Sequence, residues 1–104
     1  MGIQKISMQK HKLWCGGIFT ITEHLLYNNT LRVLDLTANE IAAQGCEAIA
    51  KYLKNENCNL ESLHLGCNKA ADFGAKAIAQ AIHLNKSLVH LDMTYNQIND
   101  FGLQ

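Results

Sequence analysis

Two aspartates and two histidines are the residues of this chain whose type and spacing point most directly to chemistry. Asp35, His64 and Asp92 follow one another at intervals of 29 and 28 residues, and His90 precedes Asp92 by two positions. Carboxylates and imidazoles can form ion pairs, transfer protons or ligate a metal ion such as Zn²⁺. These four side chains can meet only if the fold places residues that are 28 or 29 positions apart side by side.

The equal intervals belong to a repeat that runs through the sequence. Aligning the chain at Ile3, Leu31, Leu60 and Leu88 gives units of about 3–30, 31–59, 60–87 and 88–104, of which the last is incomplete. The residue at position 1 of every unit, Ile3 included, is apolar and is expected in the core. Position 15 is always glycine: Gly17, Gly45, Gly74 and Gly102. A fixed period of roughly 20–50 residues is typical of repeat architectures.

Each unit predicts one short strand followed by one helix. The first six positions of a unit read LxxLxL, and the alternation indicates a strand with one buried side. Apolar residues four apart in the later half, such as Ile49 and Leu53, predict the inner stripe of a helix. Asp72 and Asp100 precede Phe-Gly, and we expect them to cap helix starts. One unit cannot bury its own apolar face, so stacked units must share a continuous core.

Stacked units would bring the aspartates and histidines together. Parallel strands lie about 4.8 Å apart, so residues at the same position of successive units become neighbours. Position 5 holds Asp35, His64 and Asp92, and we expect His64 between the two carboxylates, with His90 on the same solvent-facing side. Three interpretations remain open: a solvated polar face with a local ion pair, a partner-binding region, or a metal site that a flat sheet encloses poorly.

Asparagines stand at position 9, where the chain leaves each strand: Asn39, Asn68 and Asn96. An amide side chain both donates and accepts hydrogen bonds. Stacked copies are therefore expected to form a structural ladder that satisfies buried backbone groups of the turns. His11 occupies this position in the first unit and breaks the ladder there.

The pattern LxxLxLxxNxIxxxG followed by a helix, at 28–29 residues, resembles the ribonuclease-inhibitor-type leucine-rich repeat. The units from Leu31 and Leu60 match closely, the last unit matches as far as it runs, and residues 3–30 match loosely. The resemblance implies an α/β fold, a right-handed β/α leucine-rich-repeat solenoid or horseshoe arc, with parallel strands concave and helices convex. We expect one repeat domain over residues 1–104, interpreted as a fragment of a longer array because neither end carries a capping unit.

Composition narrows the classes of partner. Nine basic residues balance nine acidic ones, so no global field attracts nucleic acid or an anionic membrane. No apolar run reaches the roughly 18 residues of a membrane span, and no secretory signal precedes the repeats, so we expect a cytoplasmic protein. The four cysteines form no CxxC pair. We therefore expect no structural zinc and no cofactor.

The sequence predicts a non-catalytic module for protein–protein interaction, since no GxSxG, HExxH or P-loop motif is present. Tyr95 is the strongest single anchor candidate because tyrosine offers a large contact area at low entropic cost. The predicted partner-binding residues of the concave face are Asp35, His64, His90, Asp92 and Tyr95. Alternatives are a structural segment of a longer array, of the innate-immune sensor, ciliary or effector type, and a GTPase-activating regulator using the only arginine, Arg32. Uncapped ends also predict end-to-end self-association.

Overall fold

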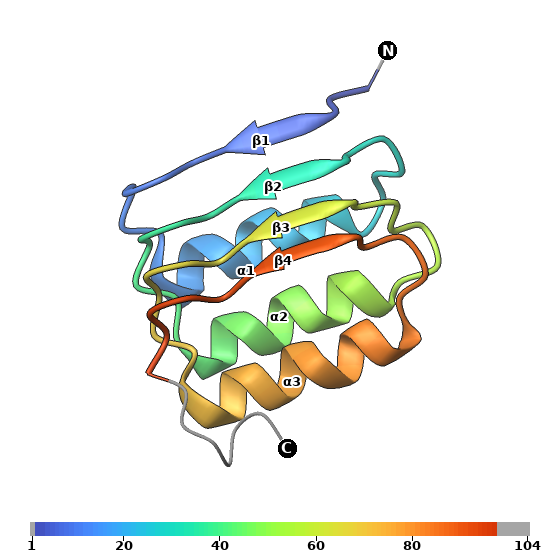
Figure 1. Ribbon diagram of the computed structural model, residues 1–104. Helices are drawn as coiled ribbons and strands as arrows, with labels where there is room; N and C mark the ends of the chain where they lie inside the picture. Colours follow the sequence, from blue (N-terminus) through green and yellow to red (C-terminus); the bar gives the residue numbers. More distant parts are fainter. Residues whose placement is uncertain (1, 98–104) are drawn as a thin grey trace.

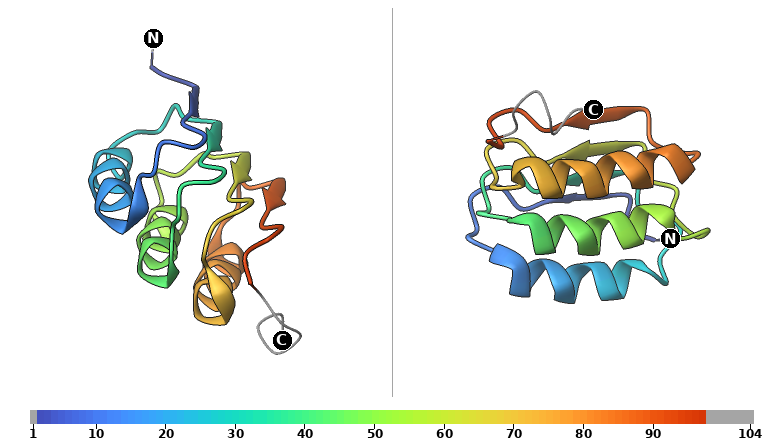
Figure 2. Two further views of the ribbon diagram at one scale, coloured as in Figure 1. Left: turned by 90° about the vertical axis from the view of Figure 1, so that its left-hand side faces the viewer. Right: turned by 90° about the horizontal axis from the view of Figure 1, so that it is seen from below.

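The first three units each fold as one strand and one helix, in the order that the sequence predicts, and the described part of the fourth contributes a strand. The structure is a computed structural model that describes residues 2–97, so Asp100 and Gly102 lie outside the described residues. Strands and helices alternate, and all the strands lie in one layer with the helices in the other (Figures 1 and 2). The elements are β1 (Lys5–Ser7), α1 (Trp14–Leu25), β2 (Val33–Asp35), α2 (Ala43–Lys54), β3 (Ser62–His64), α3 (Ala71–Leu84) and β4 (His90–Asp92).

The four strands form one parallel sheet in the order β1-β2-β3-β4. Leu34 pairs with Leu63, and Leu63 with Leu91, so every unit contributes the same position to each row of the sheet. The register is therefore set by the repeat itself. Parallel strands joined by helices that all cover one face confirm the predicted α/β solenoid.

The core lies between the two layers. Leu34, Leu36, Leu63 and Leu65 are fully buried from the strand side, and Ile49 is fully buried from α2. Because side chains alternate along a strand, positions 3 and 5 face away from the helices. We call this outward sheet surface the concave face.

Two expectations about single residues are wrong. Ile3 is 64% exposed, because it lies at the outer edge of the sheet where none of the described elements covers it. Asp72 does not cap α3, because the helix already begins at Ala71 and its N-cap position is occupied by Ala70. Asp72 instead lies in the first turn, where a carboxylate still interacts favourably with the helix dipole.

In α2 and α3, the glycine at position 15 allows the start of the helix to approach the preceding helix. A Cβ atom added to Gly74 would lie 2.9 Å from the Cβ of Ala70 and 3.1 Å from the sulfur of Cys46 in α2. Any larger side chain would push the two helices apart. In the described residues, no helix combines the length and the apolar character that a bilayer crossing requires.

Candidate functional site

Four side chains of the concave face lie close together on three strands, three of them in one row. Asp35 on β2 is the register partner of His64 on β3, which is in turn the partner of Asp92 on β4. His90 pairs with Ser62, one step along the same face. The imidazole rings of His64 and His90 lie with centroids 5.1 Å apart. We refer to Asp35, His64, His90 and Asp92 as the Asp–His cluster.

Each carboxylate of the cluster is fixed by the threonine two residues later. Oδ1 of Asp35 accepts hydrogen bonds from the backbone N–H of Thr37 at 3.1 Å and from its hydroxyl at 2.7 Å. Oδ1 of Asp92 accepts the same pair from Thr94, at 2.9 and 2.8 Å. The unit between them has Gly66 at this position, so no threonine hydroxyl two residues later orients the side chain of His64. The two carboxylates therefore have fixed orientations on either side of the central imidazole.

Hydrogen bonds hold the pKa of Asp35 below its usual value. Partial burial alone would raise that pKa, but the hydroxyl and N–H of Thr37 donate to the carboxylate and outweigh it. The side chain of Gln9 donates to Oδ2 at 2.5 Å and lowers the pKa further. The nearby His64 adds a smaller electrostatic contribution in the same direction. Asp35 is thus an ionised group through the whole neutral range.

Asp92 is ionised for a similar reason. The N–H and the hydroxyl of Thr94 lower its pKa most, and the electrostatic influence of His64 and His90 adds to them against a small opposing effect of burial. Oδ2 of Asp92 lies over Gly66, where an added Cβ would sit 3.4 Å from it. The glycine therefore leaves the carboxylate accessible between β3 and β4.

Tyr95 extends from the loop that follows β4. It is 84% exposed, and it comes directly after Thr94, which fixes Asp92. Its backbone is left-handed, with φ of 58°. The same conformation recurs at position 8 of the other units, in Lys10, Ala38 and Cys67. This turn projects the side chain at position 8 away from the core.

Asn68 shows how the asparagines connect successive units. Its Oδ1 accepts hydrogen bonds from the backbone N–H groups of Asn39 at 2.8 Å and Ile41 at 3.1 Å. Its Nδ2 donates to three carbonyl oxygens, those of Leu36, Leu65 and Gly66. Asn39 and Asn96 are buried in the same way and make equivalent bonds to the units before them. These asparagines link the loops that follow successive strands, next to the Asp–His cluster.

A second set of polar links was missed by the sequence analysis. At the opposite ends of the strands, Oδ1 of Asn85 accepts from the N–H groups of Ser87 and Leu88, and the Ser87 hydroxyl donates to the Leu60 carbonyl at 2.7 Å. Asn28 and Thr30 repeat this arrangement two units earlier. The signal was visible as Asn-x-Thr or Asn-x-Ser before an apolar residue. These motifs build turns and tie the second unit to the first and the fourth to the third.

The arrangement suits binding better than metal coordination. Within residues 2–97, no three histidine, cysteine, aspartate or glutamate side chains are placed so as to hold one metal ion. The carboxylates are instead engaged by threonine donors. Beside them His90 is exposed and His64 is partly buried. Such a surface can accept hydrogen bonds from a cationic or polar group and offers flat rings for stacking.

Comparisons with known proteins agree with this architecture. A family model described as "Leucine Rich repeat" matches residues 27–50, 56–79 and 84–104. Human (Homo sapiens) NACHT, LRR and PYD domains-containing protein 12 is 30% identical over 92 residues, which cover 88% of this chain and 9% of that protein. Mouse (Mus musculus) NACHT, LRR and PYD domains-containing protein 14 is 26% identical over 102 residues, 98% of this chain and 10% of that protein. The chain therefore spans about a tenth of the length of these curated relatives.

Solved structures show the same fold. The structure titled "Leiomodin-1 Actin-Binding Site 2 (ABS2)" superposes with a TM-score of 0.83 at 22% identity, covering 90% of this chain and 54% of that one. A Caenorhabditis elegans tropomodulin C-terminal domain gives a TM-score of 0.81 at 10% identity, covering 91% of this chain and 57% of that one. At these identities the likeness concerns the fold alone.

Proposed function

Because the chain belongs to the leucine-rich repeat family, we propose that it is a non-catalytic interaction module that binds a protein partner through its concave face. The proposed contact residues are the Asp–His cluster together with Tyr95. We further propose that the module works in the cytoplasm, as a segment of a longer array like those of its NACHT, LRR and PYD domains-containing relatives.

The row Asp35, His64, Asp92 is the observation that carries this proposal. Three polar side chains lie side by side on an open sheet surface, and both carboxylates are already fixed by hydrogen bonds. A preorganised surface loses little conformational entropy on binding, so more of the contact energy appears as affinity. The exposed ring of Tyr95 adds the large, stiff contact area that is enriched at energetic centres of interfaces.

The GTPase-activating alternative receives less support from the surroundings of Arg32. Its Nε lies 3.9 Å from a carboxylate oxygen of Glu61, and its guanidinium also donates to the carbonyl of Asn29 at 3.3 Å. These contacts engage the side chain within its own sheet. An arginine that reaches into another protein's nucleotide site would have to give them up.

Affinity capture with two matched variants tests the proposal. The baits are the original chain, a concave variant with Asp35→Asn, His64→Gln and Asp92→Asn, and a convex variant with Glu47→Gln and Lys76→Gln on the exposed helix side. All three must first show the same cooperative melting. We expect a partner that the original chain and the convex variant retain and that the concave variant loses. A partner retained equally by all three would contradict the proposal, and the absence of any specific partner would favour a purely structural segment.

A further inference from the structure

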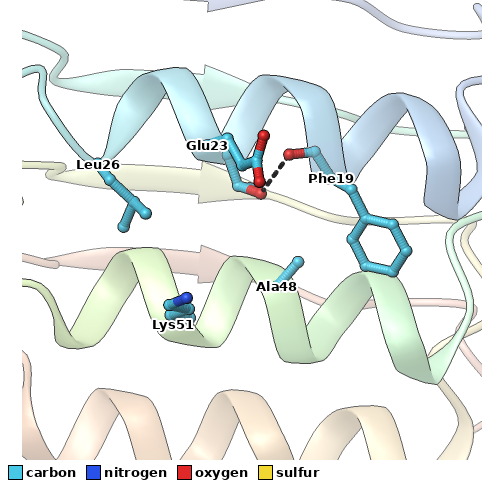
Figure 3. Close-up of a pocket in the computed structure, with 6 residues that line it drawn as sticks. Phe19, Glu23, Leu26, Ala48 and Lys51 are labelled. Atoms are coloured by element: carbon cyan, nitrogen blue, oxygen red, sulfur yellow. Dashed lines mark hydrogen bonds between the residues drawn. The ribbon is translucent and has the colours of Figure 1, made fainter.

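A groove runs between α1 and α2 on the helix side of the molecule, away from the concave face. Its floor is apolar, and one charged residue stands at each rim: Glu23 on α1 and Lys51 on α2 (Figure 3). Phe19 and Leu26 lie at its two ends, and the small side chain of Ala48 leaves room between them. The lining residues are Phe19, Thr22, Glu23, Leu26, Ala48 and Lys51.

The two apolar ends of the groove depart from the repeat pattern. In the units that follow, the positions equivalent to Phe19 and Leu26 carry charged or ionisable side chains, which water solvates well. These are Glu47 and Lys76 for Phe19, and Lys54 and His83 for Leu26. Phe19 is nevertheless 42% exposed. The repeat fold does not need apolar residues at these places, because α2 and α3 form without them.

The shape of the groove fits an elongated ligand. The hollow around Phe19 measures about 190 Å³ and the one adjoining it about 420 Å³, so the length of the groove, rather than its volume, sets it apart from the compact pockets of roughly 300–1,000 Å³ that hold small molecules. An adjoining hollow shares Glu23, Leu26 and Lys51 with it and continues to Tyr27, which is 88% exposed. Leu26 is the C-cap residue of α1 and follows Phe19 by seven positions, or about 10 Å along the helix axis. This is the distance between apolar anchors at positions i and i+7 of a docked helix.

We propose that this groove binds an amphipathic helix of a partner protein. Apolar side chains of that helix at i, i+3 or i+4, and i+7 pack against Phe19, Ala48 and Leu26. The charges at the rims determine its flanks: a lysine or arginine flank faces Glu23 and an aspartate or glutamate flank faces Lys51. This site lies on the layer opposite the Asp–His cluster and is independent of it.

Designed peptides provide the probe. Peptide M is a stapled helix of about 16 residues with leucines at i, i+3, i+4 and i+7, lysines on one flank and glutamates on the other. Two companions keep the leucines but carry only lysine or only glutamate on both flanks. Fluorescence anisotropy with the full chain should give a micromolar Kd for peptide M, at least threefold tighter than for either companion, since each companion opposes one rim charge.

Variants of the chain complete the test. Phe19→Glu combined with Leu26→Lys installs the residues that the next unit has at these positions, so it should fold while weakening peptide M at least tenfold. Phe73→Glu changes another exposed phenylalanine outside the groove and should leave the Kd unchanged. Glu23→Lys should shift the preference to the glutamate-flanked companion. The concave variant described above should bind peptide M normally, so this inference and the proposed function can fail separately.

Three results would overturn the inference. One is the absence of peptide M binding at about 1 mM, and another is binding that survives the Phe19→Glu/Leu26→Lys change. The third is self-association of the original chain in sedimentation that this double variant abolishes and Phe73→Glu does not. That result would assign the groove to a second copy of the chain.

Discussion

The imidazole rings of His64 and His90 lie with centroids 5.1 Å apart and planes inclined by 46°, although the two residues are not partners in the strand register. His64 pairs with Asp92, and His90 pairs with Ser62, so the rings meet along the diagonal between β3 and β4. Long or aromatic side chains can reach across such a diagonal. A partner that bound this face would meet two mutually inclined rings with an ionised carboxylate beside them.

The carboxylate of Asp92 should contribute its full stabilisation above about pH 4 and lose it progressively below that pH. Its folded pKa is lowered, chiefly by Thr94, relative to an unfolded value near 3.9. The folded state therefore binds fewer protons than the unfolded state in this window, and stability falls as the pH drops through the folded pKa. Asp92→Asn should lower the melting temperature at about pH 7, and the difference from the original chain should shrink as the pH falls below about 4.

Thr94→Val checks the origin of that pH dependence. It removes one of the two hydrogen bonds to Asp92 while leaving the charge in place. We expect a flatter pH profile than that of the original chain, with the larger loss again at neutral pH. A melting-temperature difference for Asp92→Asn that grows as the pH falls would have the wrong sign and would contradict the assignment.

Gly74→Ala should destabilise the chain by about 1–2 kcal/mol, even though alanine favours helices. The new Cβ would meet Ala70 and Cys46 at 2.9 and 3.1 Å, and such overpacking generally costs more than the helix propensity returns. Gly16→Ala is the control, one position earlier in its own repeat. Nothing lies within 4 Å of a Cβ there, so stability should rise by about 0.5–1 kcal/mol. Urea unfolding measures the change in the free energy of unfolding for both variants. Changes of the same sign would contradict the close approach of α2 and α3 at Gly74.

Cys67→Gly should stabilise the chain by about 0.5–1 kcal/mol. Cys67 is exposed and has φ of 55°, a left-handed conformation that costs residues with a Cβ roughly 1–2 kcal/mol. Part of that gain is offset by the greater flexibility of glycine in the unfolded chain. Ala79→Gly, at an exposed position within α3, should instead lower stability by about 1 kcal/mol. Urea unfolding of the two variants should therefore give changes of opposite sign.

The repeat period was sufficient to place the centre of the candidate site. Residues at one repeat position become neighbours in a parallel sheet, so the position of His64 between Asp35 and Asp92 followed from counting. The hydrogen bonds from threonine to the two carboxylates could not be predicted in this way, although Asp-x-Thr occurs in both flanking units, at Thr37 and Thr94. These hydrogen bonds depend on the local backbone turn between the two residues, which the alternation of apolar and polar residues does not reveal.

The start of α3 and the exposure of Ile3 show two other limits of the sequence. The helix begins before Asp72 because the chain turns sharply at Ala71, whose φ of 55° is unusual for alanine. Helix-capping preferences do not anticipate a turn that the preceding loop imposes. The burial of a repeat position depends on a neighbouring unit. Leu31 is covered and Ile3, at the sheet edge, is not.

Asn68→Ala should destabilise the chain more than the glycine, cysteine and alanine substitutions above. The side chain is buried and satisfies two backbone N–H groups and three carbonyl oxygens in two successive units. A buried polar group left without a partner costs about 1–3 kcal/mol, so several together should lower the free energy of unfolding by roughly 3–5 kcal/mol. Urea unfolding with the same chain length and buffer gives this value directly.

Two further asparagine variants show whether the number of hydrogen bonds is the cause. Asn59→Ala removes an exposed amide that makes one hydrogen bond, to the Asn29 carbonyl, and should cost less than about 1 kcal/mol. Asn68→Asp keeps the acceptor oxygen but replaces the donor with a second oxygen that faces three carbonyl groups. It should therefore be at least as unstable as Asn68→Ala at neutral pH and recover partly in mild acid, where a protonated carboxyl can donate again. If Asn68→Ala and Asn59→Ala were equally mild, the asparagine ladder would not be what holds successive units in register.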